Sequence, residues 1–359
     1  MLYEDLTGVD LYTVFSSDHV KVALRSLLHI GLDASIFTAS FKPKETPDII
    51  HVISEYPTLL LAPLFKLWTR VLIATCHGTY SIAPAHTKLR SLFKLCLGSC
   101  DALIAVSNFT RAALIKTYGL EPEKVYVIPN MINLSKFKLG TQREEAREIL
   151  NLPLNSKIIL SVGRLVKRKG YEFSLKAVKE LSRDFKNLLY IIVGRGPEEK
   201  ALRDLAIQLG IANRVKLVGE VPDSTLPLYY MAADIFLMTP VVVGHTFEGF
   251  GLVLLEAAAA KLPVVCFQSG GVSEAVMDGV NGFIVRKGDL RSLIDCVAKL
   301  LKDEELRVKM GRAGRQLAER FSWDRAVLRF EELYRELVTK RLSRDHKETQ
   351  SILASRPLI

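Results

Sequence analysis

Glu248 and Glu256 are separated by seven residues and flank a glycine-rich turn, Gly249-Phe250-Gly251. A strong helical pattern follows this turn directly. Glycines allow a backbone to approach a ligand closely, and the first turn of a helix offers N–H groups that suit a phosphate. Glu256 lies further along the helix and could accept hydrogen bonds from sugar hydroxyls. For either glutamate alone, the alternative is an ordinary surface position beside a strand–loop–helix joint.

A basic loop, with the sequence SVGRLVKRKG at 161–170, follows a strand pattern. Loops at the carboxyl ends of strands are where open α/β sheets bind their ligands. Arg164 and Lys169 could neutralise a diphosphate through charge-assisted hydrogen bonds. For Lys167 and Arg168, a solvated position in a basic turn is the better interpretation.

Three other turns also follow predicted strands. They contain His77 in the sequence Cys-His-Gly-Thr-Tyr, the run Gly-Arg-Gly-Pro at 194–197, and the pair Gly-Gly at 270–271. Alone, each of these turns is weak evidence, because most glycine turns are structural and most histidines after strands are packed or solvated. His245 stands in the approach to Glu248, where a simple loop residue is the main interpretation.

Short apolar runs alternate with longer helical patterns along almost the whole chain. This alternation predicts parallel sheets with helices on both faces, and the lack of polar alternation predicts strands that are buried on both sides. The fold class is therefore α/β, with two doubly wound, Rossmann-like domains. The predicted strands are 9–15, 34–38, 49–53, 71–75, 102–106 and 125–128, then 158–162, 189–193, 215–218, 235–238, 264–267 and 283–285.

A mixed polar stretch at 134–140 separates the two series of strands. It places the first domain at 1–140 and the second at 141–322. An amphipathic helix is predicted at 323–339, and the last residues, 340–359, are expected to form a polar, frayed tail. The candidate apolar positions of that helix are Leu328, Leu333, Tyr334 and Leu337.

The composition of the 359 residues is 49% hydrophobic and 25% charged, which excludes a disordered or wholly coiled-coil chain. The net charge of +10 indicates anionic partners such as nucleotides or an acidic membrane surface. Because the basic residues are spread along the chain, nucleic acid is not expected as a partner.

Five cysteines form too sparse and odd a set for a disulfide framework, and their spacing does not favour zinc. The acidic start of the chain lacks the basic region of a signal peptide, and Lys66 and Arg70 interrupt the longest apolar region, 59–75. These observations predict a cytoplasmic protein, and they leave membrane association open.

Taken together, the residues resemble the GT-B glycosyltransferases, specifically the large retaining group often called family 4. That family shows Gly-Arg-Leu with Lys-Gly, then Gly-x-Gly-Pro, then Glu-x7-Glu running into a Gly-Gly turn. This chain has all four in that order, and the match covers about 155–335. The resemblance implies two domains facing across a cleft, the first binding the acceptor and the second a nucleotide-sugar donor, with the terminal helix crossing back to the first domain.

The resemblance also implies roles for individual residues. Arg164 and Lys169 would hold the diphosphate of the donor, and Glu256 would bind the nucleotide ribose. Glu248 would lie beside the donor sugar, and the backbone of Gly249–Leu252 would meet the phosphates.

The first half of the chain matches this family more loosely. His77 stands in a turn similar to the family's His-Gly turn, whose histidine reaches the donor sugar from the other domain. Ser16-Ser17-Asp18 replaces the glycine-rich loop that commonly follows the first strand, so the contacts of that loop are in question.

The implied reaction is transfer of a sugar, with retention at the anomeric carbon, from a nucleoside diphosphate sugar to a lipid, saccharide or other hydroxyl acceptor. The sequence has no Asp-x-Asp pair, so no metal and no other cofactor is expected. A GT-B nucleotide-sugar epimerase and a non-catalytic nucleotide-sugar binding protein remain the alternatives.

The segment His86–Leu97 combines basic and apolar residues and suggests contact with an anionic membrane surface. An ordinary amphipathic helix packed on its own sheet explains the same pattern equally well.

Overall fold

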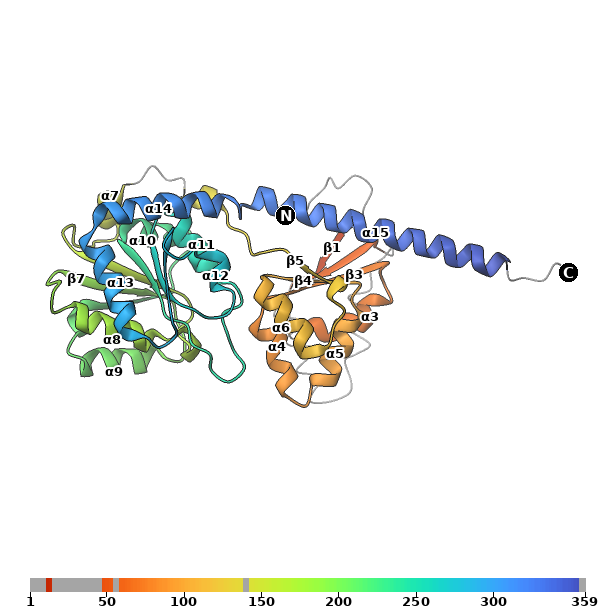
Figure 1. Ribbon diagram of the computed structural model, residues 1–359, viewed down its shortest axis with the longest axis horizontal. Coiled ribbons are helices and arrows are strands. Elements are labelled where there is room, and N and C mark those ends of the chain that lie inside the picture. Colours follow the sequence, from red (N-terminus) through yellow and green to blue (C-terminus); the bar gives the residue numbers. More distant parts are fainter. Residues whose placement is uncertain (1–10, 15–46, 54–57, 138–141, 355–359) are drawn as a thin grey trace. The chain divides into compact units, whose positions relative to one another are not determined.

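The computed structural model describes residues 11–14, 47–53, 58–137 and 142–354. The chain divides into two compact units, one formed by Met1–Ile128 with Ala326–Ile359 and the other by Pro129–Arg325. Each unit contains one parallel sheet with helices packed around it (Figure 1). The α/β class and the two Rossmann-like parts expected from the sequence are confirmed.

The sheet of the first unit is parallel and has the strand order β1-β2-β3-β4-β5. All residues of β2, β3 and β4 are buried, which explains why these runs lack polar alternation. The predicted strand at 34–38 and the Ser16-Ser17-Asp18 loop lie outside the described residues. The described strands are β1 (Leu11–Val14), β2 (Ile49–Val52), β3 (Val71–Cys76), β4 (Ala102–Ala105) and β5 (Val125–Val127).

Short helices connect these strands. In α6, Ser107 caps the first turn by accepting a hydrogen bond from the Thr110 N–H at 3.0 Å, and Gly119 ends the helix in the left-handed conformation. The helical elements of this unit before the terminal helix are η1 (Thr58–Leu61), α3 (Ala62–Lys66), α4 (Thr79–Ile82), η2 (Ala83–His86), α5 (Arg90–Ser99), α6 (Asn108–Tyr118) and η3 (Pro122–Lys124).

The sheet of the second unit is also parallel and has the strand order β11-β10-β9-β6-β7-β8. The chain therefore winds outward in one direction from β6, returns to β9 beside it, and winds outward in the other direction. This is a doubly wound order with its switch point between β6 and β9. Its strands are β6 (Lys157–Val162), β7 (Leu188–Val193), β8 (Val215–Gly219), β9 (Ile235–Met238), β10 (Val264–Phe267) and β11 (Gly282–Val285).

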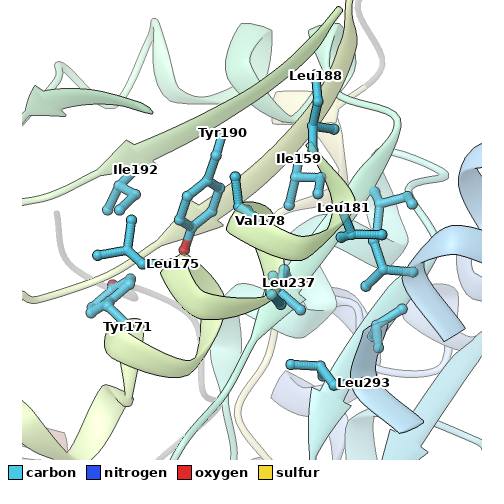
Figure 2. Close-up of a cluster of buried hydrophobic side chains, with 14 of the residues drawn as sticks. Ile159, Tyr171, Leu175, Val178, Leu181, Leu188, Tyr190, Ile192, Leu237 and Leu293 are labelled. Atoms are coloured by element: carbon cyan, nitrogen blue, oxygen red, sulfur yellow. The ribbon is translucent and has the colours of Figure 1, made fainter. Parts of the chain in front are cut away.

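A large apolar core lies between this sheet and helices such as α8 (Figure 2). Leu175, Val178 and Leu181 of α8 face Ile159 and Ile192 of the sheet, at the spacing expected for one apolar face of a helix. The other helical elements of this unit are η4 (Leu134–Phe137), α7 (Arg143–Ile149), η5 (Lys167–Lys169), α8 (Tyr171–Leu181), α9 (Glu199–Gln208), η6 (Ala212–Arg214), α10 (Leu226–Ala232), α11 (Leu252–Ala259), α12 (Val272–Ala275), α13 (Leu290–Lys302) and α14 (Glu304–Glu319).

The terminal helix, α15 (Trp323–Ala354), returns to the first unit. Leu333, Tyr334 and Leu337 are buried against the sheet of that unit, as the sequence pattern predicts. Leu328 is 64% exposed, so its prediction as a packed position is wrong.

The predicted frayed tail is wrong for 340–354, where α15 continues. Ion pairs four residues apart support this polar extension. Lys340 pairs with Glu336, and Arg341 pairs with Asp345 at 3.2 Å.

The boundary between the units also differs from the expected one at residue 140, because 129–137 belong to the second unit. Ile132 forms a β-bridge with Ser322, Lys136 pairs with Asp223 at 3.0 Å, and the ring of Phe137 contacts that of Tyr230.

Candidate functional site

The loops after β6 and β9 emerge side by side from the switch point of the second sheet. The first contains the basic sequence of 163–170 and the second leads to Glu248. Ligands of doubly wound sheets bind at this place. The basic loop and Glu248 therefore lie where the fold is suited to bind a ligand.

Glu248 is paired with two cations. Its Oε2 lies 2.8 Å from Lys169 Nζ and 3.0 Å from Arg168 Nη1. The side chains of Lys169 and Glu248 are each only 10% exposed, so little solvent screens this pair. The interpretation of Arg168 as a solvated turn residue is wrong, because η5 turns its side chain toward Glu248.

Arg164 and Lys167 lie on the exposed side of the same loop. The structure thus brings Lys169 together with Glu248 but places Arg164 towards solvent.

Gly170 fixes the position of the basic loop against the end of β9. A Cβ atom at Gly170 would lie 1.9 Å from the carbonyl oxygen of Thr239, and its φ of 64° is left-handed. The Thr239 hydroxyl donates to the Gly170 carbonyl at 2.8 Å, and the Tyr171 hydroxyl donates to the Gly163 carbonyl at 2.9 Å. Lys169 is therefore held on a short, closely packed segment.

The Gly-Arg-Gly-Pro turn packs directly beneath this loop. Cβ atoms at Gly194 and Gly196 would lie 2.2 Å from the carbonyl oxygens of Gly163 and Leu165, respectively. The Leu165 N–H donates to the Arg195 carbonyl at 2.9 Å. These glycines permit close contact between two backbone segments. This structural role explains the turn without a bound ligand.

The Gly-Gly turn holds the backbone of Glu248 in the same way. A Cβ atom at Gly270 would lie 1.9 Å from the Glu248 carbonyl oxygen, and the N–H of Gly271 donates to that oxygen at 2.9 Å. Glu248 is consequently fixed from both ends, by the Gly-Gly turn at its backbone and by two cations at its carboxylate.

The glycine-rich turn leads from Glu248 into α11. Gly251 has a φ of 87° and begins the helix, and Leu252 is 39% exposed. Phe250 is buried, and its ring contacts that of Phe321. The side chain of Phe250 therefore belongs to the core, and only the backbone of this turn is suited to meet a ligand.

Glu256 lies on the second turn of α11 and accepts a 2.5 Å hydrogen bond from the hydroxyl of Tyr230. Burial raises the pKa of Glu256, and the hydrogen bond from Tyr230 acts in the opposite direction. Tyr230 is fully buried, and its ring stacks on Phe236. Tyr230 could not be predicted from the sequence, because nothing in the spacing of α10 and α11 shows that they bring these two side chains together.

His77 lies in the other unit, after β3, and is exposed. Its Nε2 is 2.9 Å from the carbonyl oxygen of Ile53. His245 is also exposed, in the loop that approaches Glu248.

Within the described ranges, no group of three or more His, Cys, Asp or Glu side chains is arranged to hold a metal ion. Among the helices formed by these residues, none combines the length and apolar composition needed to cross a membrane.

Two family models match the chain in succession. The model for glycosyl transferases group 1 matches residues 142–317, and the model for Glycosyltransferase Family 4 matches residues 19–136. A GDP-mannose-dependent alpha-(1-6)-phosphatidylinositol monomannoside mannosyltransferase from Mycolicibacterium smegmatis is 32% identical over 286 residues, which are 77% of this chain and 73% of the relative. The chain belongs to the group 1 glycosyl transferases.

Another relative in this family is a D-inositol 3-phosphate glycosyltransferase from Corynebacterium diphtheriae, which is 34% identical over 288 residues. That match covers 76% of this chain and 66% of the relative, so the chain spans about two thirds of the relative's length.

Solved structures have the same fold as this group 1 glycosyl transferase. HepE from Anabaena, in complex with UDP and glucose, has a TM-score of 0.67 at 22% identity and covers 83% of this chain and 78% of its own. A sucrose-phosphate synthase from Thermosynechococcus elongatus has a TM-score of 0.72 at 24% identity and covers 85% of this chain and 76% of its own. The GT-B fold expected from the sequence is confirmed.

Proposed function

We propose that this protein transfers a glycosyl group from a nucleoside diphosphate sugar to a hydroxyl acceptor, with retention at the anomeric carbon and without a metal ion. The observation that supports this most strongly is the cluster of Lys169, Arg168 and Glu248 at the switch point of the second sheet, in a chain of this family. The named relatives act as glycosyltransferases, and one of them uses GDP-mannose.

In this proposal the second unit binds the donor. Lys169 and Arg164 hold the diphosphate, and Arg168 joins them because it lies against the same carboxylate as Lys169. The backbone of Gly249–Leu252 faces the phosphates at the start of α11, where N–H groups have no partners within the helix.

Glu256 binds the nucleotide ribose through its carboxylate. Tyr230 is a positioning residue in this scheme, because its hydroxyl donates to one carboxylate oxygen and leaves the other available. The raised pKa of Glu256 reflects its burial, and a ribose hydroxyl would replace part of the hydration that burial removes.

Charge stabilisation is the main catalytic contribution of the protein. Two cations face one carboxylate at the cluster, which leaves a surplus of one positive charge (two minus one) for the departing diphosphate. This cationic arrangement supplies what a divalent ion supplies in other transferases, so the reaction is proposed to proceed without metal. The acceptor oxygen bonds to the anomeric carbon on the face that the diphosphate leaves, and the acceptor proton passes to the departing phosphate oxygen as the sugar–phosphate bond breaks. Attack from that same face accounts for retention.

Glu248 is fixed beside the proposed position of the donor sugar. His77 is proposed as a further residue that contacts this sugar. His77 is exposed and follows a buried strand, which suits a residue that contacts a ligand.

The acceptor is proposed to be presented at an anionic membrane surface. Helix α5 buries Phe93 and Cys96 and exposes Leu92 and Leu95, which are 44% and 61% exposed, beside the exposed Lys94. Leu67, at the end of the adjacent α3, is 77% exposed. Apolar and basic side chains exposed together are typical of surfaces that bind anionic lipid.

A transfer assay tests the proposal. The full chain is incubated with UDP, GDP and ADP sugars, with inositol, inositol phosphate and phosphatidylinositol vesicles as acceptors, with and without EDTA. We expect transfer from one donor class, an unchanged rate with EDTA, and an α-linked product from an α-linked donor by NMR. Inversion would contradict retention, loss of activity in EDTA would contradict metal independence, and epimerised donor without transfer would identify the alternative enzyme.

A further inference from the structure

A basic cavity of about 380 Å³ lies in the second unit, apart from the site described above. Its walls come from α7, the end of α11 and α14, and they carry the cationic side chains of Arg143, Lys261, Arg307 and Arg312. No acidic residue is among the described residues that line it. Such a concentration of positive charge requires an explanation, because like charges at close range repel.

The cavity lies at the amino ends of the strands of the second sheet, and the proposed donor site lies at their carboxyl ends. Pro263, which lines the cavity, immediately precedes β10, whereas the loops that carry Lys169 and Glu248 follow the carboxyl ends of β6 and β9. In a parallel sheet the amino ends of all strands lie on one side and their carboxyl ends lie on the opposite side. Helix α11 connects the two places, since it begins beside the glycine-rich turn and ends at Ala259 in the cavity wall.

The charges of the cavity are only partly neutralised. Arg143 lies 3.3 Å from Asp234, but Asp234 also pairs with Arg147 at 2.9 Å. Lys261 and Arg312 have no acidic side chain within 4.0 Å among the residues that the structure describes.

Arg307 is held rigidly at the cavity. Its side chain is 3% exposed, and its Nη1 donates to the carbonyl oxygens of Leu300 and Leu301 at 2.6 and 3.2 Å. Its ion pair with the largely exposed Glu304 is long, at 3.7 Å. The Nε atoms of Arg307 and Arg143 are both buried without a hydrogen-bond partner in the structure. Buried, under-satisfied guanidinium groups are costly unless an anion compensates them.

The end of α11 does not supply that compensation. The carbonyl oxygens of Ala257, Ala258 and Ala259 already accept hydrogen bonds from the N–H of Leu262, the N–H of Lys261 and the side chain of Arg315, respectively. The negative end of this helix is thus engaged within the protein.

We propose that this cavity binds a phosphate monoester, at a site separate from that of the donor diphosphate. Guanidinium groups bind phosphate through paired, charge-assisted hydrogen bonds, and a phosphate monoester carries about −1.5 to −2 charges at pH 7. The volume lies in the range of small-molecule sites, about 300–1,000 Å³, so a phosphate with a sugar-sized body fits.

Isothermal titration of the full chain with ribose 5-phosphate tests this, with ribose as the neutral control. We expect one site per chain for ribose 5-phosphate and no binding of ribose. In the double variant Lys261→Gln/Arg312→Gln, affinity should fall by about tenfold or more, since a hydrogen bond to a charged group is worth about a factor of ten or above. Both positions are exposed, so the variant should keep the melting temperature of the wild type.

Two controls separate this site from general charge effects and from the donor site. Lys309→Gln removes an exposed charge from the same helix, α14, at a position that does not line the cavity, and should leave affinity unchanged. Lys169→Gln should also leave it unchanged. In a second experiment, the probe is a vesicle of phosphatidylcholine with phosphatidic acid. If the wild type binds these vesicles and the double variant does not, the phosphate monoester that the cavity binds is a lipid headgroup. The proposal would be overturned if the wild type bound neither probe, or if the double variant bound ribose 5-phosphate with the affinity of the wild type. It would also be overturned if Lys169→Gln lost affinity for ribose 5-phosphate.

Discussion

The two units of this chain hold their candidate site residues in different ways. In the second unit, Lys169 and Glu248 lie on segments that glycines allow to touch neighbouring backbone, and each side chain is only 10% exposed. In the first unit, His77 is exposed, and the buried polar cluster around His51 lies instead beneath the terminal helix. Under the proposed function, this difference would give the second unit a preformed site for a constant ligand part and the first unit a surface suited to a variable acceptor.

Gly270→Ala is the change with the largest expected effect on this comparison. The new Cβ would lie 1.9 Å from the Glu248 carbonyl oxygen, and the left-handed φ of 56° adds strain. We expect loss of transfer by more than about 100-fold, because misplacing a catalytic group by about 1 Å can cost that much.

Gly279→Ala is the matched control. Its φ is also positive, at 73°, but no atom lies within 4 Å of the added Cβ. If both variants lose the same activity, strain alone explains the effect, and the close contact with Glu248 is not the reason.

The second expected effect concerns the first unit and depends on pH. Burial, with a smaller contribution from His77, lowers the pKa of His51 from 6.5 to about 4. Its ring nitrogens contact the Tyr334 hydroxyl at 2.7 Å and the Thr75 hydroxyl at 2.8 Å.

A lowered histidine pKa means that the unfolded state binds the proton more readily. The stability linked to His51 is therefore fully present above pH 6.5 and is lost as pH falls towards about 4, by roughly 3 kcal/mol in total. Hydrogen exchange of β2 and β3 between pH 4 and 7 should show this slope, and His51→Gln should flatten it. His86→Gln, at an exposed position, is the control, and an unchanged slope in His51→Gln would refute the assignment.

Lys169→Ala should reduce the initial rate of transfer by about tenfold or more, because a hydrogen bond to a charged group is worth about 1.5–3 kcal/mol. Melting temperature should change little, since Arg168 still pairs with Glu248. Lys167→Ala, at an exposed position in the same loop, should retain the normal rate. Equal rates in the two variants would remove Lys169 from the proposed mechanism.

Tyr230→Phe should have the smallest effect. It removes only the hydroxyl that donates to Glu256 at 2.5 Å, while the ring keeps its packing on Phe236. We expect nucleotide affinity to fall by only about three- to tenfold, because Tyr230 acts on the nucleotide indirectly, through Glu256. Tyr229→Phe is the neighbouring control, and affinity equal to the wild type in both would show that Glu256 needs no positioning partner.

Most of the second sheet could be predicted from the sequence because its central strands, such as β9 and β10, are buried on both faces. The predicted 235–238 and 264–267 match β9 and β10 residue for residue. Lys169 and Glu248 could be singled out for the same reason, since each follows a strand of a doubly wound sheet.

The remaining features depend on tertiary contacts that spacing does not reveal. Arg168 points inward because of the short helical turn η5, and Tyr230 meets Glu256 only because α10 packs on α11. Residues 340–354 carry opposite charges four residues apart, which is a helical spacing. Their high polarity nevertheless predicts a frayed tail, because nothing in the sequence shows that these ion pairs form.

Nucleotide binding by three proteins, the wild type, Glu256→Gln and His77→Ala, tests the division of labour between the units most directly. The thermal shift caused by UDP, GDP and ADP is measured for each, because a ligand at a hundredfold excess over Kd stabilises the folded state by about 2.7 kcal/mol. We predict that one nucleotide shifts the wild type clearly more than the others, that Glu256→Gln shrinks this shift, and that His77→Ala keeps it while transfer is impaired. Loss of the shift in His77→Ala with an intact shift in Glu256→Gln would contradict the account.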